Sequence, residues 1–358
     1  MKVVFVLPSF HTNMFYALRA LVAAGVEPVL VVRRASQARL DGVRVIRPGA
    51  NGLSLRSAGE LLRREAPDLV VVRRTPGISR RIFLAALTQR RKIVSYDQQP
   101  YLMPAGWRSL TGRLTSPFRT PRFTPVHGLP DALGAPDPAA SYLPFPVESL
   151  EQGARRVWAP GGRTRIICVA KLGQPRKNHF VLIEALEQLA DRFDFSLTFV
   201  GITIDAKGFD DSYLSRLRNY PEQGPIGERV SVLEEVPFDA MRGLYLEHDL
   251  CVLPSHDEPL GTAPLEAMGM GCAAIVTTEC GSAGYLLGAE RAGKPCGHIV
   301  RAGDRAALAG LLEMMLKDRH LLETYGRNAL AWTREEFCEP VFARRFRNMA
   351  ARAGVKRP

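Results

Sequence analysis

Residues 249–278, DLCVLPSHDEPLGTAPLEAMGMGCAAIVTT, contain the local pattern that decides the fold of the second half of this chain. DLCVLP is typical of a buried strand that ends at Pro254, and SHDEPLG is typical of a loop. A helix is expected from about Thr262, because Pro264 is tolerated in a first turn. AAIVTT then predicts a second buried strand. Strand, helix and strand in this order indicate a parallel sheet.

The same alternation runs through both halves of the sequence. Short apolar runs predict further strands at 3–7, 28–32, 43–46, 68–72, 92–96, 165–170, 196–201 and 230–233. Helical patterns lie at about 13–24, 56–65, 79–90, 178–191 and 237–247, and residues 304–352 are mostly helical. The rhythm breaks over the proline-rich residues 98–147. We therefore predict an α/β protein with two doubly wound, Rossmann-like parallel-sheet domains.

The predicted boundaries follow from this break in the pattern. The first domain covers 1–147 and the second covers 148–337, with a linking segment near 147–162. The last helix, 338–358, is expected to pack back toward the first domain. Ligands of parallel sheets bind at the carboxyl ends of the strands, so the predicted site is the cleft between the two domains.

The composition is that of a soluble globular protein. The chain has 358 residues, of which 46% are hydrophobic and 23% charged. It contains no apolar run near the roughly 18 residues of a membrane-spanning helix, and MKVVFVLPSF fits a buried strand better than a secretory signal. Six scattered cysteines without a C-x-x-C pair argue against a zinc or dithiol site and indicate reduced thiols. These features predict a cytoplasmic protein.

The net charge of +12 lies entirely in the first half. Residues 1–150 contain 21 Lys and Arg against 9 Asp and Glu, whereas the remainder is neutral. This asymmetry suggests an anionic partner for the first half, and the alternative is a solvated basic surface that binds nothing specific. Nucleic acid is not expected, since the arginines are scattered and no recognition helix or RNP-like aromatic pattern accompanies them.

Residues 98–130 contain no acidic residue and four arginines, interleaved with large apolar residues. The arginines are Arg108, Arg113, Arg119 and Arg122, and the apolar residues are Trp107, Leu110, Leu114, Phe118 and Phe123. Such a segment could rest on an anionic membrane or hold an acidic or lipid-linked acceptor. The alternative is an insertion that packs into the first domain's core. We favour core packing for the apolar residues and a ligand role for the arginines.

Polar residues directly follow several predicted strands. The seven residues after the strand at 165–170 contain three cations, Lys171, Arg176 and Lys177, and lead into a helix. This arrangement predicts an anion site, and the alternative is a surface run of charge. In the first half, His11 follows the first strand and opens a helix. His11 could bind a ligand or transfer a proton, or it could be incidental to a helix cap. No G-x-G-x-x-G motif is present.

Glu258 and Glu266 stand on either side of the loop-to-helix turn. The loop can fold so that both carboxylates face one cleft. Gly261 allows the backbone to approach a ligand closely, and the N–H groups of Gly261 and Thr262 can point at an anion. A carboxylate there suits a pair of hydroxyls such as a ribose diol. The alternatives are a solvated loop acid for Glu258 and compensation of the helix dipole for Glu266.

Several of these stretches resemble one known family. EPLGTAPLEAMGMG is similar to the E-x7-E region of retaining glycosyltransferases with the GT-B fold, in particular glycosyltransferase family 4. ICVAKLGQPRKNHFVLIEAL resembles the family's strand, basic loop and helix. LPFPVE at 143–148 resembles its linker, and HIVRAGDRAALAGLLEMMLKDRHLLETYGRNA resembles its final segment. The resemblance is close over about 144–337 and only architectural over 1–143.

The resemblance implies a GT-B fold and a hexosyltransferase type of activity. Such an enzyme transfers a sugar with retention of configuration from a nucleotide diphosphate sugar to a hydroxyl acceptor, here a cell-surface glycan or glycolipid. No metal or other cofactor is expected. Independently of the resemblance, the composition predicts a cytoplasmic protein, and the basic first domain could contact the inner face of the plasma membrane.

The resemblance also implies roles for individual residues. Lys171 and Lys177 match cations that hold the donor diphosphate and stabilise the leaving nucleoside diphosphate. Glu266 matches the glutamate that binds the ribose, and Glu258 matches the one that contacts the transferred sugar. Backbone N–H groups around Leu260, Gly261 and Thr262 would complete the phosphate cradle.

The first half departs from the family's pattern. PSFHTN replaces the usual glycine pair, and the frequent histidine after the strand at 92–96 is missing, so that His11 and Asp97 are the candidates on the acceptor side. Tyr285 stands where the family often has glutamate. Two other functions stay open: a nucleotide-sugar hydrolase or epimerase on the same scaffold, and a non-enzymatic module that binds anions or membranes.

Overall fold

The computed structural model describes residues 1–10, 14–34, 40–49, 52–73, 75–102, 120–128, 136–151, 156, 162–203 and 208–356. The candidate His11 and three of the arginines of segment 98–130, namely Arg108, Arg113 and Arg119, lie outside these residues. Packing divides the chain into two compact units. Met1–Val147 and Phe337–Pro358 form the first unit, and Glu148–Glu336 forms the second.

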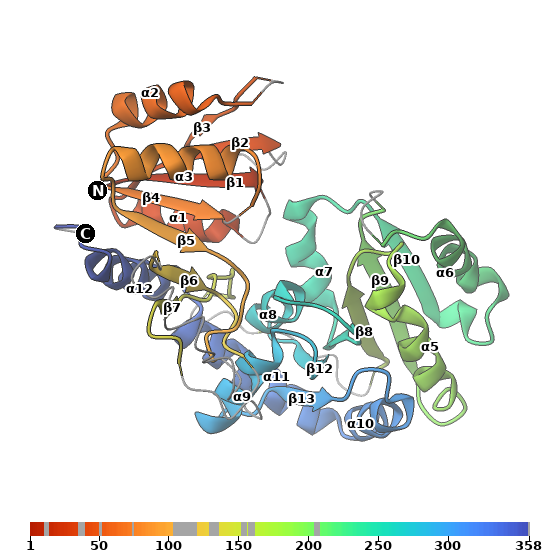
Figure 1. Ribbon diagram of the computed structural model, residues 1–358. Coiled ribbons are helices and arrows are strands. Elements are labelled where there is room, and N and C mark those ends of the chain that lie inside the picture. The colour runs from red at the N-terminus through yellow and green to blue at the C-terminus, as the bar shows by residue number, and fades with distance from the viewer. Residues whose placement is uncertain are drawn as a thin grey trace, which may run out of the picture. The chain divides into compact units, whose positions relative to one another are not determined.

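The first unit contains a parallel sheet of seven strands in the order β3-β2-β1-β4-β5-β6-β7. The strands are β1 Lys2–Ser9, β2 Glu27–Arg34, β3 Arg44–Ile46, β4 Leu69–Arg73, β5 Ile93–Tyr96, β6 Arg122–Thr124 and β7 Ala140–Tyr142. The helices are α1 Phe15–Ala23, α2 Leu55–Glu65, α3 Ile78–Thr88 and α12 Glu339–Arg352 (Figure 1).

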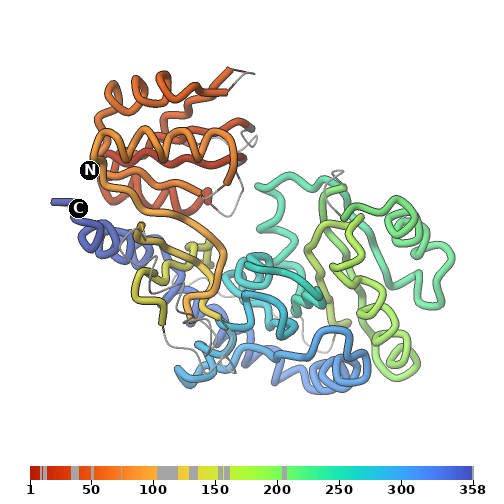
Figure 2. The backbone as a smooth tube through the Cα atoms, in the orientation of Figure 1, coloured from red at the N-terminus to blue at the C-terminus, as the bar shows by residue number. Residues whose placement is uncertain are grey.

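Helices cover both faces of this sheet. Val4 and Val6 pack with α2 and α3 in one core. Phe5 alternates with them along β1, so it points to the opposite face, where its ring lies 5.9 Å from that of Phe346 on α12. The C-terminal helix α12 (blue in Figure 2) also packs against α1 (red). The chain therefore returns after the second unit to complete the first.

The second unit contains a parallel sheet of six strands in the order β10-β9-β8-β11-β12-β13. Its strands are β8 Thr164–Val169, β9 Phe195–Gly201, β10 Val230–Glu234, β11 Leu250–Leu253, β12 Ala273–Thr277 and β13 Gly297–Val300. Its helices are α5 His179–Glu187, α6 Asp211–Gln223, α7 Met241–Glu247, α8 Thr262–Gly269, α9 Ala283–Arg291, α10 Arg305–Lys317 and α11 Arg319–Glu336.

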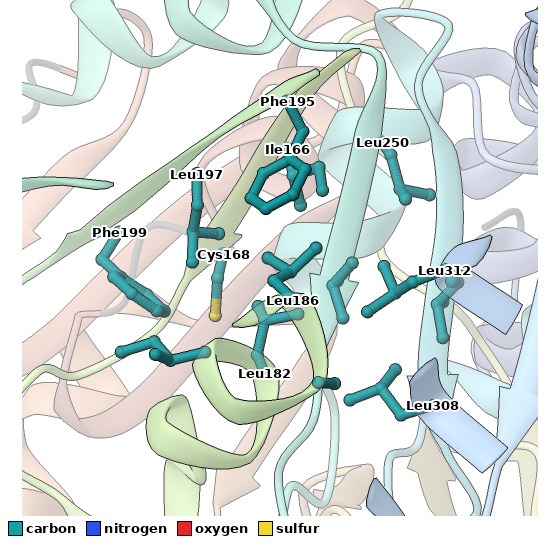
Figure 3. Packing of buried hydrophobic residues seen from close by; sticks show 14 of the residues in the cluster. Ile166, Cys168, Leu182, Leu186, Phe195, Leu197, Phe199, Leu250, Leu308 and Leu312 are labelled. Atoms are coloured by element: carbon teal, nitrogen blue, oxygen red, sulfur yellow. The ribbon is translucent and has the colours of Figure 1, made fainter. Parts of the chain in front are cut away.

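Alternating side chains of β8 supply two cores on opposite faces of this sheet. Ile166 and Cys168 pack with α5 and α10, as Figure 3 shows. Ile167 belongs to the other core, which includes residues of α7 and α8. With helices on both faces, β11 and β12 in the middle of the sheet are buried along their whole length, so a ligand reaches them only at their ends. The prediction of two Rossmann-like parallel-sheet domains is confirmed.

Some elements differ from those expected. β6 and β7 were not predicted because each has only three residues within the proline-rich segment. α6 was missed because Pro221 lies inside it; Asp210 caps its N-terminus by accepting a hydrogen bond from the Tyr213 N–H, 3.0 Å away. None of the helices in the described ranges combines the length and apolarity needed to cross a membrane.

Candidate active site

Two loops meet at the carboxyl ends of the neighbouring strands β8 and β11. The basic loop, residues 170–178, ends in a 3₁₀ turn at Pro175–Lys177 and then in Asn178, whose φ is +61°. The Asn178 side chain donates to the Pro254 carbonyl over 3.2 Å, and the Arg176 carbonyl accepts from the His256 N–H over 2.8 Å. These bonds join the basic loop to the acidic loop, residues 254–261.

Lys177 and Glu258 form an ion pair between the two loops. The ammonium of Lys177 donates to Oε2 of Glu258. The Lys177 side chain is only 5% exposed, whereas that of Glu258 is 19% exposed. The other carboxylate oxygen of Glu258 accepts from the Gly261 N–H, 3.3 Å away. Two residues expected to act on one ligand are therefore in contact.

The backbone of the acidic loop is held by the segment after β12. Glu258 forms an isolated parallel bridge with Cys280: its N–H donates to the Glu279 carbonyl over 3.2 Å, and its carbonyl accepts from the Gly281 N–H over 2.9 Å. A Cβ on Gly281 would lie 2.2 Å from the Pro259 carbonyl oxygen. Only glycine fits this close approach.

Gly261 begins α8 in the left-handed region, with φ +62°. A Cβ at this position would lie 2.9 Å from Oγ of Ser282 and 3.4 Å from Cγ of Glu258. The neighbouring Leu260 is buried, and Thr262 is half-buried at the first position of α8. The Gly261 N–H, expected in the phosphate cradle, is here directed at Glu258.

Glu266 lies one turn inside α8 and is half-buried. Its Oε2 accepts from the hydroxyl of Tyr245 on α7, 2.9 Å away. Burial raises the pKa of Glu266, and the Tyr245 hydrogen bond partly counteracts that rise. Tyr245 itself was missed from the sequence, since a tyrosine on a helix gives no signal of its partner across the fold.

Lys171 follows β8 and is half-buried beside the other cations of the basic loop. Burial, followed by the charges of Lys177 and Arg176, lowers its pKa. Among the described residues, no carboxylate forms an ion pair with Lys171. Cations held together in this way favour a bound polyanion, because the anion offsets both their desolvation and their mutual repulsion.

The second unit thus gathers Lys171, Lys177, Glu258 and Glu266, with the start of α8, at one edge of its sheet. Tyr285, which stands where the family often has glutamate, is buried on α9 and is 2% exposed. No cluster of three His, Cys, Asp or Glu side chains suited to a metal occurs in the part of the chain that the structure describes.

In the first unit, the acceptor-side candidate Asp97 follows β5 and forms an ion pair with Arg122. Its Oδ1 lies 2.8 Å from Nη1 of Arg122. Arg122 also pairs with the buried Asp137 over 2.9 Å and donates to the Pro100 carbonyl. The expectation that Arg122 faces an external anion is wrong. Arg122 is 6% exposed on β6, and two carboxylates of its own chain neutralise it. Phe123 packs in the core against Tyr96, as expected.

Comparisons with known proteins identify the family and the fold. Residues 152–332 match the family described as glycosyl transferases group 1. The lipopolysaccharide core biosynthesis mannosyltransferase LpcC of Rhizobium leguminosarum bv. viciae is 26% identical over 193 residues, which are 54% of this chain and 51% of that protein. The chain thus spans about half the length of this curated relative.

Solved structures resemble the whole chain in fold. A glycosyltransferase from Rickettsia africae ESF-5 has a TM-score of 0.74 at 15% identity, covering 100% of this chain and 99% of that one. Anabaena Alr3699/HepE, solved in complex with UDP-glucose, has a TM-score of 0.72 at 15% identity, covering 98% and 100%. The fold is therefore that of the GT-B glycosyltransferases.

Since the family match covers half of its residues, this chain belongs to the group 1 glycosyl transferases. The resemblance to GT-B glycosyltransferases is confirmed.

Proposed function

We propose that this protein transfers a sugar, with retention of configuration, from a nucleotide diphosphate sugar to a hydroxyl acceptor. The observation that carries the proposal is the pair Lys177–Glu258, held at the start of α8 with Glu266 one turn further on. Cations for a diphosphate, a carboxylate for a sugar and a second carboxylate for a ribose therefore lie at one edge of the sheet.

The chemistry assigned to these residues is electrostatic. The bond between the anomeric carbon and the β-phosphate oxygen breaks, and a bond to the acceptor oxygen forms on the same face of the sugar. The leaving phosphate takes up the acceptor's proton. Charge therefore accumulates on the diphosphate, where Lys171 and Lys177 stabilise it without reorganisation. Glu266 accepts hydrogen bonds from the ribose hydroxyls of the donor. Glu258 contacts the transferred sugar and holds it in position.

Catalysis in this proposal needs no metal ion. Two lysines supply the positive charge that a divalent cation would otherwise provide for the leaving diphosphate. Transfer is therefore expected to persist in excess EDTA. A complete loss of activity that added Mg²⁺ or Mn²⁺ restores would contradict this part of the proposal.

We further propose that the acceptor belongs to a cell-surface glycan or glycolipid and that the enzyme works at the cytoplasmic face of the plasma membrane. The name of LpcC, a lipopolysaccharide core mannosyltransferase, supports this class of acceptor. The first unit also exposes Leu84 (41%) and Leu87 (50%) on α3, near the exposed Arg81 and Arg90. Leucines among arginines suit a peripheral contact with anionic lipids.

The test is a thermal-stability screen with UDP, GDP, ADP and TDP sugars, followed by transfer assays with the donor found. A ligand that binds only the folded state raises its stability. Lys177→Ala and Glu266→Ala should remove both the stabilisation and the transfer. The matched control is Glu222→Ala, an exposed glutamate on α6. Full activity of either site variant would contradict the assignment.

The same assay separates transfer from hydrolysis. A transferase releases the sugar slowly without an acceptor, whereas a nucleotide-sugar hydrolase releases it as fast as it transfers. Binding to anionic vesicles with no affinity for any nucleotide sugar would instead favour the non-enzymatic module.

A further inference from the structure

A cavity of about 410 Å³ opens beside the carboxyl end of β4 in the first unit. Its apolar lining comes from Val72, Pro76 and Phe83, and its polar lining comes from Arg73, Thr75, Ser79 and Arg80. The volume falls within the range of small-molecule sites, and the carboxyl edge of a parallel sheet is where such sites form. Pockets that combine an apolar wall with a few polar groups suit an amphipathic ligand such as a substituted sugar.

The polar part of the lining is positive. Arg73 and Arg80 both contribute to it, and none of the seven described residues that line the cavity is acidic. Within the described part of the chain, no ion pair joins either guanidinium to a carboxylate. The sequence contains no Asp or Glu between Asp68 and Asp97, so no acid of β4, α3 or β5 can neutralise them.

Arg73 is held in position by neutral groups. Its guanidinium lies 5.5 Å from the centre of the Tyr96 ring, and it donates to the Gln98 side chain over 3.5 Å. Tyr96 stays a neutral phenol, since burial raises its pKa to about 12. A guanidinium stacked on an aromatic ring loses little freedom on binding, so it is pre-organised for an oxyanion.

The start of α3 adds donors at the same place. The helix has no side-chain N-cap, and its first hydrogen bond runs from the Arg81 N–H to the Gly77 carbonyl. The N–H groups of Ile78, Ser79 and Arg80 therefore have no partner within the helix. Ser79 is buried, and its hydroxyl accepts from Thr75 over 3.1 Å, so its own proton is left to donate.

We propose that this cavity binds an anionic group, a phosphate or a carboxylate, carried by the acceptor glycan. Arg73 and Arg80 bind the anion, Ser79 and the first turn of α3 donate to it, and Phe83 with Pro76 contacts the sugar that carries it. Calling this ligand an acceptor rests on the proposed function. The acceptor class is then an acidic or phosphorylated glycan rather than a neutral one.

The experiment is an NMR titration of the full-length, deuterated protein with inorganic phosphate, and separately with acetate. The amide signals of Ser79 and Arg80 should shift and saturate, and the stronger ligand identifies the anion. Removing one charge-assisted donor with Arg80→Gln should weaken binding at least about tenfold. The matched control is Arg81→Gln, which removes the same charge from the next residue. Arg81, which is exposed like Arg80, donates to the Leu53 carbonyl and does not line the cavity.

Two outcomes would overturn the proposal. One is that neither anion shifts the Ser79 and Arg80 amides in a saturable way, and the other is that Arg81→Gln weakens binding as much as Arg80→Gln does. A subsequent titration with the donor nucleotide sugar, read at residues 171–178, tests the proposed function separately. If only this second titration fails, the anion site stands and the donor assignment falls. If only the first fails, the donor site stands and the anion site falls.

Discussion

The pair Lys177–Glu258 allows a quantitative prediction, because its two members are buried to different extents. Glu258→Gln leaves the Lys177 ammonium unpaired at 5% exposure, beside Lys171 and Arg176. Breaking a buried ion pair in this way lowers the free energy of unfolding by about 3 kcal/mol or more. Lys177→Met removes the cation beside Glu258. The Glu258 carboxylate is 19% exposed, and it still accepts a hydrogen bond from the Gly261 N–H. That change should cost less, about 1–2 kcal/mol.

Urea unfolding of the wild type, both single variants and the double variant measures these costs. The double variant removes both charges, so its loss in the free energy of unfolding should be smaller than the sum of the losses of the two single variants. The expected difference, which is the coupling energy, is about 1–3 kcal/mol. A coupling below about 0.5 kcal/mol, or a larger loss for Lys177→Met than for Glu258→Gln, would refute the reasoning.

Three further predictions concern residues around the same sheet edge. Gly261→Ala should lower stability and donor affinity more than Gly293→Ala does. Both glycines have positive φ, +62° and +71°, but an added Cβ would meet neighbouring atoms at Gly261 and none at Gly293. Burial, followed by the charge of Lys177, lowers the pKa of His179 from 6.5 to about 3. Since the unfolded chain takes up that proton near pH 6.5, stability should fall as the pH drops from about 6.5 toward 3, and His179→Phe should flatten this slope in acid-unfolding experiments. Tyr245→Phe removes the hydrogen bond that lowers the pKa of Glu266, so the acid limb of donor binding should move to higher pH in calorimetric titrations.

The sequence predicted much of the second unit because its signals are local. β11, the acidic loop and α8 lie within about twenty residues, and Pro254 and Gly261 mark where the elements change. The rule that ligands gather at the carboxyl ends of parallel strands then brings Lys177 and Glu258 to one edge, although they are 81 residues apart. Their direct contact was not predicted, because spacing alone does not tell whether two charges share a ligand or each other.

The first unit was predicted less well because its polar contacts are not local. The carboxylates that neutralise Arg122 come from Asp97 and Asp137, on segments before and after it, so the sequence alone made Arg122 resemble a surface cation. The same holds for the cavity beside β4. No sequence pattern marked Arg73 as a ligand-binding residue. The proposal that it binds an anion depends on the ring of Tyr96, on the neighbouring strand, which holds its guanidinium in position.

The most direct test of the proposed activity is transfer by the Glu266→Ala and Lys177→Ala variants with the donor that stabilises the wild type most. Both variants should remain folded by circular dichroism and lose nearly all transfer, while the Glu222→Ala control keeps it. Wild-type transfer rates in either folded site variant would contradict the assignment of this edge as the donor site.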